Sequence, residues 1–131
     1  MKAIVVTDQA AGTAGMTLVE RPKPQAAIND VVVQVHASGF TWDELTWPST
    51  WTDRLGRDRT PVVIPGQELA GVVTALGYGT TGLSVGQRVF GLSDSYRGGT
   101  WRSMWPSRHA TSRRYRATST SRWARAWRCR S

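Results

Sequence analysis

The chain has little of what cysteine- or histidine-based sites require: one cysteine, Cys129, and two histidines among 131 residues. A single thiol cannot form an intramolecular disulfide or supply a zinc cluster built from cysteines. Long apolar runs are also absent, because the run at the N-terminus ends after Val6. That run is too short for a signal-peptide core, and no other segment approaches the length of a membrane span. We therefore expect a cytoplasmic protein that does not enter a membrane.

Lysine and acidic residues are missing from the last part of the chain. Residues 101–131 contain nine arginines, four of the seven tryptophans, and no Lys, Asp or Glu. Residues 1–100 hold eight basic and nine acidic side chains, so the formal net charge of +8 comes entirely from the C-terminal end. The composition changes abruptly near Gly99 and Thr100. Function must therefore be considered separately for residues 1–100 and 101–131.

Residues 1–100 alternate short β-branched runs with turn residues. The runs cover residues 2–7, 16–20, 31–35, 68–76 and 85–92, with glycines at several corners. Short strands separated by glycine corners are typical of a β-barrel or sandwich. Thr41 and Glu44 have the spacing of a capping box, so one short helix should begin there and end before Pro48. The predicted fold class is mainly β with a short helix.

Four segments of residues 1–100 resemble, in order, the N-terminal half of the medium-chain dehydrogenases/reductases. They are Val35–Gly39 (VHASG), Pro65–Val73 (PGQELAGVV), Gly77–Gly79 (GYG) and Val85–Gly91 (VGQRVFG). Each motif is weak alone, but four at family-like spacing are specific. The resemblance implies a GroES-like, alcohol dehydrogenase-type domain over residues 1–100. We expect a partly open β-barrel that is truncated relative to the family, followed by a disordered tail.

Two positions of this pattern differ from the zinc-dependent alcohol dehydrogenases. The resemblance implies a cysteine where this chain has Thr41 and a histidine where it has Gln67. A hydroxyl and a neutral amide are poor substitutes for thiolate and imidazole at zinc. The resemblance therefore points to the zinc-independent quinone oxidoreductase and enoyl reductase type. In that type NADPH delivers hydride to a small carbonyl, enone or quinone substrate without a metal.

Thr41, Asp43 and Gln67 are the candidate cleft residues, and none of them is assigned a certain catalytic role. Each also has a simpler structural interpretation. Thr41 can cap a helix, Asp43 can interact favourably with a helix dipole, and Gln67 can satisfy backbone groups at the start of a strand.

The part of the family that binds the dinucleotide has no counterpart in the sequence. In the family a separate Rossmann domain binds NADPH through a glycine-rich turn between a strand and a helix. The segment Gly77–Gly82 spells Gly-x-Gly-x-x-Gly, but the residues Leu-Ser-Val-Gly follow it and do not predict a helix. We expect a barrel corner there, no NADPH bound by this chain, and an N-terminal fragment that is inactive alone.

Two other interpretations of function remain open, and the first rests on the arginine-rich end. Arginines interleaved with tryptophan can bind phosphates and stack on bases, which would give a small barrel with a nonspecific nucleic-acid-binding tail. A GroES-like structural module that works by self-association into an oligomer is the other alternative.

A change of reading frame explains the composition of residues 101–131 better than a selected basic arm. Arg, Trp, Ser, Thr and Ala without Lys, acids, Leu, Ile or Val are typical of GC-rich DNA translated out of frame. If each codon is read from the last base of the preceding one, Met104–Trp105 must give Val and Trp105–Pro106 must give Ala. Synonymous choices elsewhere allow a continuation that begins Leu-Ala-Glu-Tyr-Val and resembles the family after Gly-Gly-Thr. We therefore interpret residues 101–131 as an out-of-frame tail.

Overall fold

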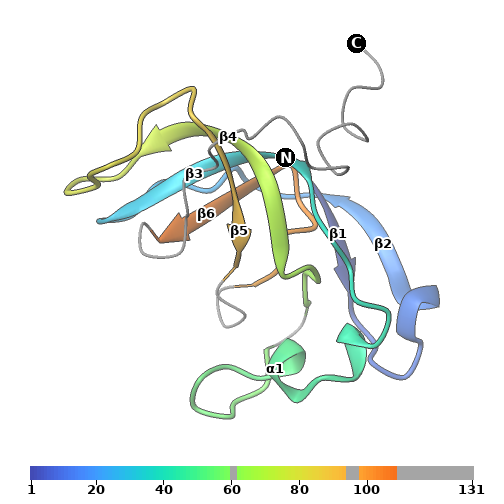
Figure 1. Ribbon diagram of the computed structural model, residues 1–131. Helices are drawn as coiled ribbons and strands as arrows, with labels where there is room; N and C mark the ends of the chain where they lie inside the picture. The colour runs from blue at the N-terminus through green and yellow to red at the C-terminus, as the bar shows by residue number, and fades with distance from the viewer. Residues whose placement is uncertain (60–61, 94–97, 109–131) are drawn as a thin grey trace, which may run out of the picture.

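The computed structural model describes residues 1–59, 62–93 and 98–108 (Figure 1). Two 3-10 segments, η1 (Gly12–Gly15) and η2 (Glu44–Thr46), and one short helix, α1 (Pro48–Trp51), accompany the strands. The described strands are β1 (Lys2–Val6), β2 (Met16–Glu20), β3 (Asp30–Ala37), β4 (Glu68–Leu76), β5 (Arg88–Leu92) and β6 (Met104–Arg108). The fold is mainly β with a short helix, as the sequence predicts. Within the described ranges, no helix is long and apolar enough to cross a membrane.

The strands form two antiparallel sheets. β1 and β2 make a hairpin whose register runs from Lys2 opposite Glu20 to Val6 opposite Met16. The second sheet has the strand order β5-β4-β3-β6, and each neighbouring pair is antiparallel. In Figure 1 the hairpin lies to one side of this curved sheet, and α1 lies at the end where β4 begins.

Residues 101–103 join the two sheets. The amide of Ile4 donates to the carbonyl of Trp101 at 2.9 Å, and the amide of Ser103 donates to the carbonyl of Lys2 at 2.9 Å. On the other side, the amide of Val35 in β3 donates to the carbonyl of Ser103 at 3.0 Å. These backbone bonds connect β1 to β3 through one short segment. The described strands therefore form a barrel that is partly open.

The core lies between β3, β4 and β5. Its buried members share the inward face of these strands or of the adjoining turn: Val31, Val33, Leu69, Val73, Leu83 and Val89. Val35 packs against this cluster, whereas the neighbouring His36 is exposed, as strand alternation predicts. Full burial of one Val or Leu side chain contributes roughly 1.5–3 kcal/mol. The predicted strand over residues 85–92 is shorter in the structure, where β5 begins at Arg88.

The predicted capping box at Thr41 and Glu44 is wrong. Thr41 is exposed and η2 has no side-chain cap, although this short 3-10 helix lies where the sequence predicts a short helix and ends before Pro48. The reason is that the Glu44 side chain turns inward. It is 1% exposed, and its Oε1 accepts a hydrogen bond from the amide of Gly66, so it does not return to Thr41. The sequence did not predict α1, which begins at Pro48. Proline is tolerated at the first helical position because that position needs no amide hydrogen.

The prediction that a disordered tail begins at residue 101 is wrong for residues 101–108. β6 pairs with β3 from Asp30 opposite Arg108 to Gln34 opposite Met104, and Trp101 is half-buried. Strand pairing uses backbone donors and acceptors that every residue except proline carries in full, so an unusual composition does not prevent it. The rest of the predicted tail, residues 109–131, lies outside the described residues.

Candidate functional site

Three segments meet where β3 ends and β4 begins: residues 38–44, 65–68 and 99–101. The hydroxyl oxygens of Ser38 and Thr100 lie 2.6 Å apart, and the Thr100 hydroxyl donates to the carbonyl of Glu68 at 2.8 Å. The indole nitrogen of Trp101 donates to the carbonyl of Gly39 at 3.2 Å. Residues 99–101 are thereby joined to both other segments, although the three are far apart in the sequence.

Gly99 allows the third segment to approach the second. Its amide donates to the carbonyl of Ile64 at 2.7 Å, and the amide of Trp101 donates to the carbonyl of Pro65 at 3.0 Å. A Cβ at position 99 would lie 2.0 Å from the Pro65 oxygen and 2.1 Å from the Ile64 oxygen. Only glycine fits between these carbonyls, so this close approach of the two segments requires glycine at position 99.

The structure brings the loops of Thr41 and Gln67 together but holds the two residues differently. Thr41 is exposed, and its carbonyl accepts the amide of Glu44 at 2.9 Å. Gln67 is half-buried, and its carbonyl accepts the amide of Ser93 at 2.6 Å, with the Ser93 hydroxyl 3.5 Å from the Gln67 side-chain oxygen. The Glu44–Gly66 hydrogen bond connects the two loops. Asp43 is half-buried, and its Oδ1 is buried without a partner among the described residues.

Sequence reasoning missed the part that Glu44 plays in this site. One carboxylate oxygen holds the Gly66 amide, immediately before Gln67, and Oε2 is buried without a partner within the described ranges. The sequence carries no signal for this role, because an acid after a threonine also fits the first turn of a helix. Glu44 therefore fixes the turn that presents Gln67.

Arg102 is an unusual cation for its position. It forms a bridge opposite Ala3 of β1, a residue that is 1% exposed, and its Nε donates to the carbonyl of Gly99 at 2.9 Å. Burial lowers the pKa of the Arg102 guanidinium to about 10. A cation beside the apolar interior costs free energy unless an anion accompanies it.

The described residues do not provide a metal cluster or a dinucleotide cradle. No group of three or more His, Cys, Asp or Glu side chains gathers there in a metal-binding arrangement. The glycine pattern Gly77–Gly82 lies in the turn after β4, where the Tyr78 carbonyl accepts the amide of Asn29 at 2.8 Å. No helix begins at this turn, so the residues present do not fit the pyrophosphate of NADPH.

Comparison with known families identifies the barrel. The model of the alcohol dehydrogenase GroES-like domain matches residues 27–116, which is more than half of the chain. The chain belongs to the alcohol dehydrogenase GroES-like domain family. The match includes the segments that carry Thr41 and Gln67, and it continues past Thr100 through β6. The resemblance to the N-terminal part of medium-chain dehydrogenases/reductases is thereby confirmed.

The GroES-like domain is similar to part of larger proteins. It is 40% identical over 92 residues to an L-threonine 3-dehydrogenase of Saccharopolyspora erythraea, and the match covers 70% of this chain and 25% of that protein. The chain thus spans about a quarter of the length of the curated relatives it matches. A putative zinc-dependent alcohol dehydrogenase from Rhizobium etli superposes with a TM-score of 0.76 at 25% identity, over 90% of this chain and 33% of that one.

Two further structures share the fold. A quinone oxidoreductase from Pseudomonas syringae has a TM-score of 0.74 at 21% identity, over 91% of this chain and 34% of that one. A mycobacterial neighbour solved in complex with NADPH has a TM-score of 0.71 at 24% identity, over 92% of this chain and 35% of that one. Zinc-type and quinone-type proteins therefore share this architecture, and the fold alone does not separate them.

Proposed function

We propose that this chain is the GroES-like, substrate-side part of a zinc-independent oxidoreductase that uses NADPH to reduce a small carbonyl, enone or quinone. The observation that carries the proposal is the pair Thr41 and Gln67 on two loops joined by Glu44. Neither side chain is a ligand that zinc favours. A complete enzyme of this kind needs a dinucleotide-binding domain, which the described residues do not supply.

The same two side chains suit a reaction without a metal. A threonine hydroxyl and a glutamine amide can each donate a hydrogen bond to a substrate carbonyl oxygen, which gains negative charge as hydride arrives. The Ser93 hydroxyl lies near the side-chain oxygen of Gln67, so the amide nitrogen remains available as a donor. In this proposal Thr41 and Gln67 orient and polarise the substrate, and Glu44 positions Gln67.

We further propose that the reading frame changes just after codon 100, so that the dinucleotide-binding domain lies in another frame. The position of Arg102 supports this, because the alternative reading places alanine opposite the buried Ala3. The nucleotide sequence around codon 100 is the direct test. A restored frame that encodes a strand, a glycine-rich turn and a helix is the expected result, and an early stop in that frame would contradict the proposal.

A zinc-dependent dehydrogenase is the second candidate. The relative from Saccharopolyspora erythraea favours a dehydrogenase, because the 40% identity is to an L-threonine 3-dehydrogenase. The Rhizobium etli structure favours it too, as that protein is described as a putative zinc-dependent alcohol dehydrogenase. The two candidates differ in metal requirement and in the direction of hydride transfer.

One set of assays separates the candidates. The frame-restored protein, stripped of metal by a chelator, should oxidise NADPH when menadione is added and should not oxidise L-threonine. The variant Thr41→Val should lower kcat for menadione about 10-fold, whereas Trp42→Phe at the neighbouring exposed position should leave it within about twofold. Loss of menadione reduction on chelation, or zinc-dependent oxidation of L-threonine, would favour the second candidate. The 131-residue chain should not oxidise NADPH with any substrate.

A further inference from the structure

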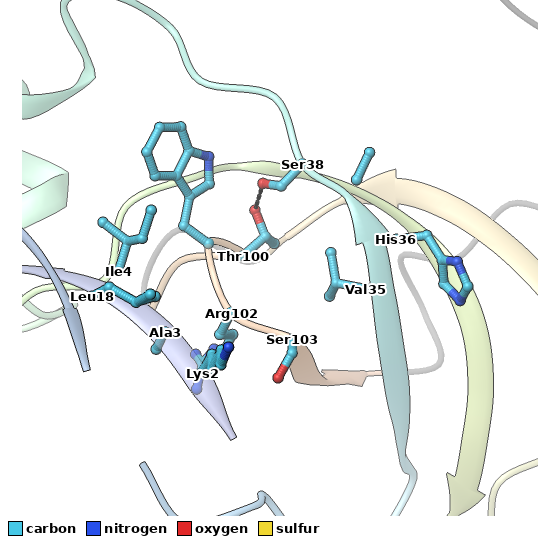
Figure 2. Close-up of a pocket in the computed structure, with 12 residues that line it drawn as sticks. Lys2, Ala3, Ile4, Leu18, Val35, His36, Ser38, Thr100, Arg102 and Ser103 are labelled. Atoms are coloured by element: carbon cyan, nitrogen blue, oxygen red, sulfur yellow. Dashed lines mark hydrogen bonds between the residues drawn. The ribbon is translucent and has the colours of Figure 1, made fainter. Parts of the chain in front are cut away.

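A cavity of about 370 Å³ lies between the β1–β2 hairpin, the end of β3 and residues 100–103 (Figure 2). Ser38 and Thr100, which line one end of it, also belong to the candidate site, so the cavity adjoins the proposed substrate site. Cavities of roughly 300–1,000 Å³ are the size that small-molecule ligands occupy in proteins. The cavity is broadly open to solvent, so a small aromatic molecule would be covered on one side only.

The walls of the cavity are mostly apolar. Ile4 and Leu18 face each other across the hairpin, and Leu18 is 62% exposed. Val35 and Ala37 of β3 line the opposite wall. Figure 2 shows Ile4 and Leu18 on one side, Val35 on the other, and the imidazole of His36 directed away from the space between them. The body of a ligand in this cavity would therefore be apolar.

The polar groups lie at the two ends of the cavity. Lys2, Arg102 and Ser103 gather at one end, and the hydroxyls of Ser38 and Thr100 lie at the other (Figure 2). No Asp or Glu is among the described residues that line it. Glu20 pairs with Lys2 in the hairpin register, but its carboxylate binds the N-terminal amine at 3.1 Å. One end of the cavity therefore carries cations without a lining carboxylate.

We propose that this cavity binds a small aromatic carboxylate, with its ring between the Ile4–Leu18 pair and Val35 and its carboxylate at the Lys2–Arg102 end. The charge at that end selects an anion, and the apolar walls select a ring system over a small inorganic ion. This ligand class is distinct from the neutral carbonyl or quinone of the proposed reaction.

Calorimetric titration of the full chain with naphthoate, and with naphthyl methanol as the neutral analogue, tests the proposal. Naphthoate should bind at least about 10-fold more tightly, because one charge-assisted hydrogen bond is worth about that factor. The backbone amides of Ile4, Val35 and Ser103 should shift in nuclear magnetic resonance spectra. Equal binding of the two probes, no binding of naphthoate, or shifts confined to other residues would overturn the proposal.

The two lysines of the chain provide a matched pair of variants. Lys2→Gln should weaken naphthoate binding about 3- to 10-fold and leave naphthyl methanol unchanged, whereas Lys23→Gln, in the exposed loop after β2, should change neither. Both residues are exposed, so neither change should disturb folding, which circular dichroism will check. Arg102→Gln is a second variant at the cationic end, with the same expected direction. If Lys23→Gln weakens naphthoate as much as Lys2→Gln does, the attraction is a general surface effect and the proposed site is wrong.

Discussion

Replacing Arg102 with methionine should stabilise the protein. Arg102 lies opposite the buried Ala3, and burial lowers the pKa of its guanidinium to about 10. Methionine keeps the length and apolar contacts of the arginine stem but carries no charge. The change therefore removes the cost of placing a cation beside the interior without leaving a large void.

The expected gain follows from the pKa and from one hydrogen bond. The fall in the pKa of Arg102 corresponds to roughly 3 kcal/mol of preference for the neutral form, an upper value because the side chain keeps part of its solvent contact. Loss of the bond from Nε to the Gly99 carbonyl offsets about 1 kcal/mol. We expect Arg102→Met to raise the free energy of unfolding by about 1–2 kcal/mol, or the Tm by about 4–10 °C for a domain of this size.

Urea unfolding followed by circular dichroism measures this difference, with Arg88→Met as the control. Arg88 is exposed on β5, so its replacement should change the free energy of unfolding by less than about 0.5 kcal/mol. Burial disfavours the charged guanidinium only in the folded state, so the advantage of the variant should be present at neutral pH, where Arg102 is charged in both states. If Arg102→Met is no more stable than wild type at neutral pH, the reasoning about the misplaced cation is refuted.

Three further predictions test other parts of the structure. Gly99→Ala should lower the free energy of unfolding by about 3 kcal/mol or more, because a Cβ meets two backbone carbonyls and breaks their hydrogen bonds. The control is Gly86→Ala, where φ is +85° and no atom lies near the new Cβ. It should lower the free energy of unfolding by only about 1 kcal/mol in the same urea titration. Arg57→Ala should raise the pKa of Asp53, because the hydrogen bond from the Arg57 side chain lowers it; carboxyl carbon shifts measure the change. Since the folded-state pKa is depressed, the contribution of Asp53 to stability is present above its unfolded pKa. That contribution is lost as the pH falls through the folded-state pKa. Purified protein should hold no stoichiometric zinc by elemental analysis, and one tightly bound zinc per chain that is lost in Gln67→Ala would contradict the zinc-independent proposal.

The strands and the core could be predicted from the sequence because their signals are local. β-branched runs and strand alternation identified β1 to β5 within a few residues and placed Val31, Val33 and Val35 on one face. The same alternation placed His36 on the other face. The family resemblance was equally accessible, because its motifs are short and occur in order.

The candidate site could be predicted only in part, because its contacts join distant segments. Thr41 and Gln67 were found by their positions in family motifs, but the hydrogen bond from the Gly66 amide to Glu44 spans 22 residues and has no sequence signature. Composition also gave the wrong prediction for residues 101–108, because backbone hydrogen bonds join this segment to β1 and β3. In both cases, contacts between residues far apart in the sequence determine the structure.

The boundary near Thr100 therefore separates two compositions but not two structures. Backbone bonds from Gly99, Trp101 and Ser103 place this segment in the barrel, and the side chain at position 102 lies opposite the buried Ala3. A guanidinium there both costs stability and adds positive charge at the end of the cavity that includes Lys2. Arg102→Met should consequently gain stability and lose affinity for naphthoate at the same time, while Lys2→Gln loses affinity without gaining stability. A variant that loses both stability and affinity would show that Arg102 is an integral part of the fold, which the out-of-frame interpretation does not allow.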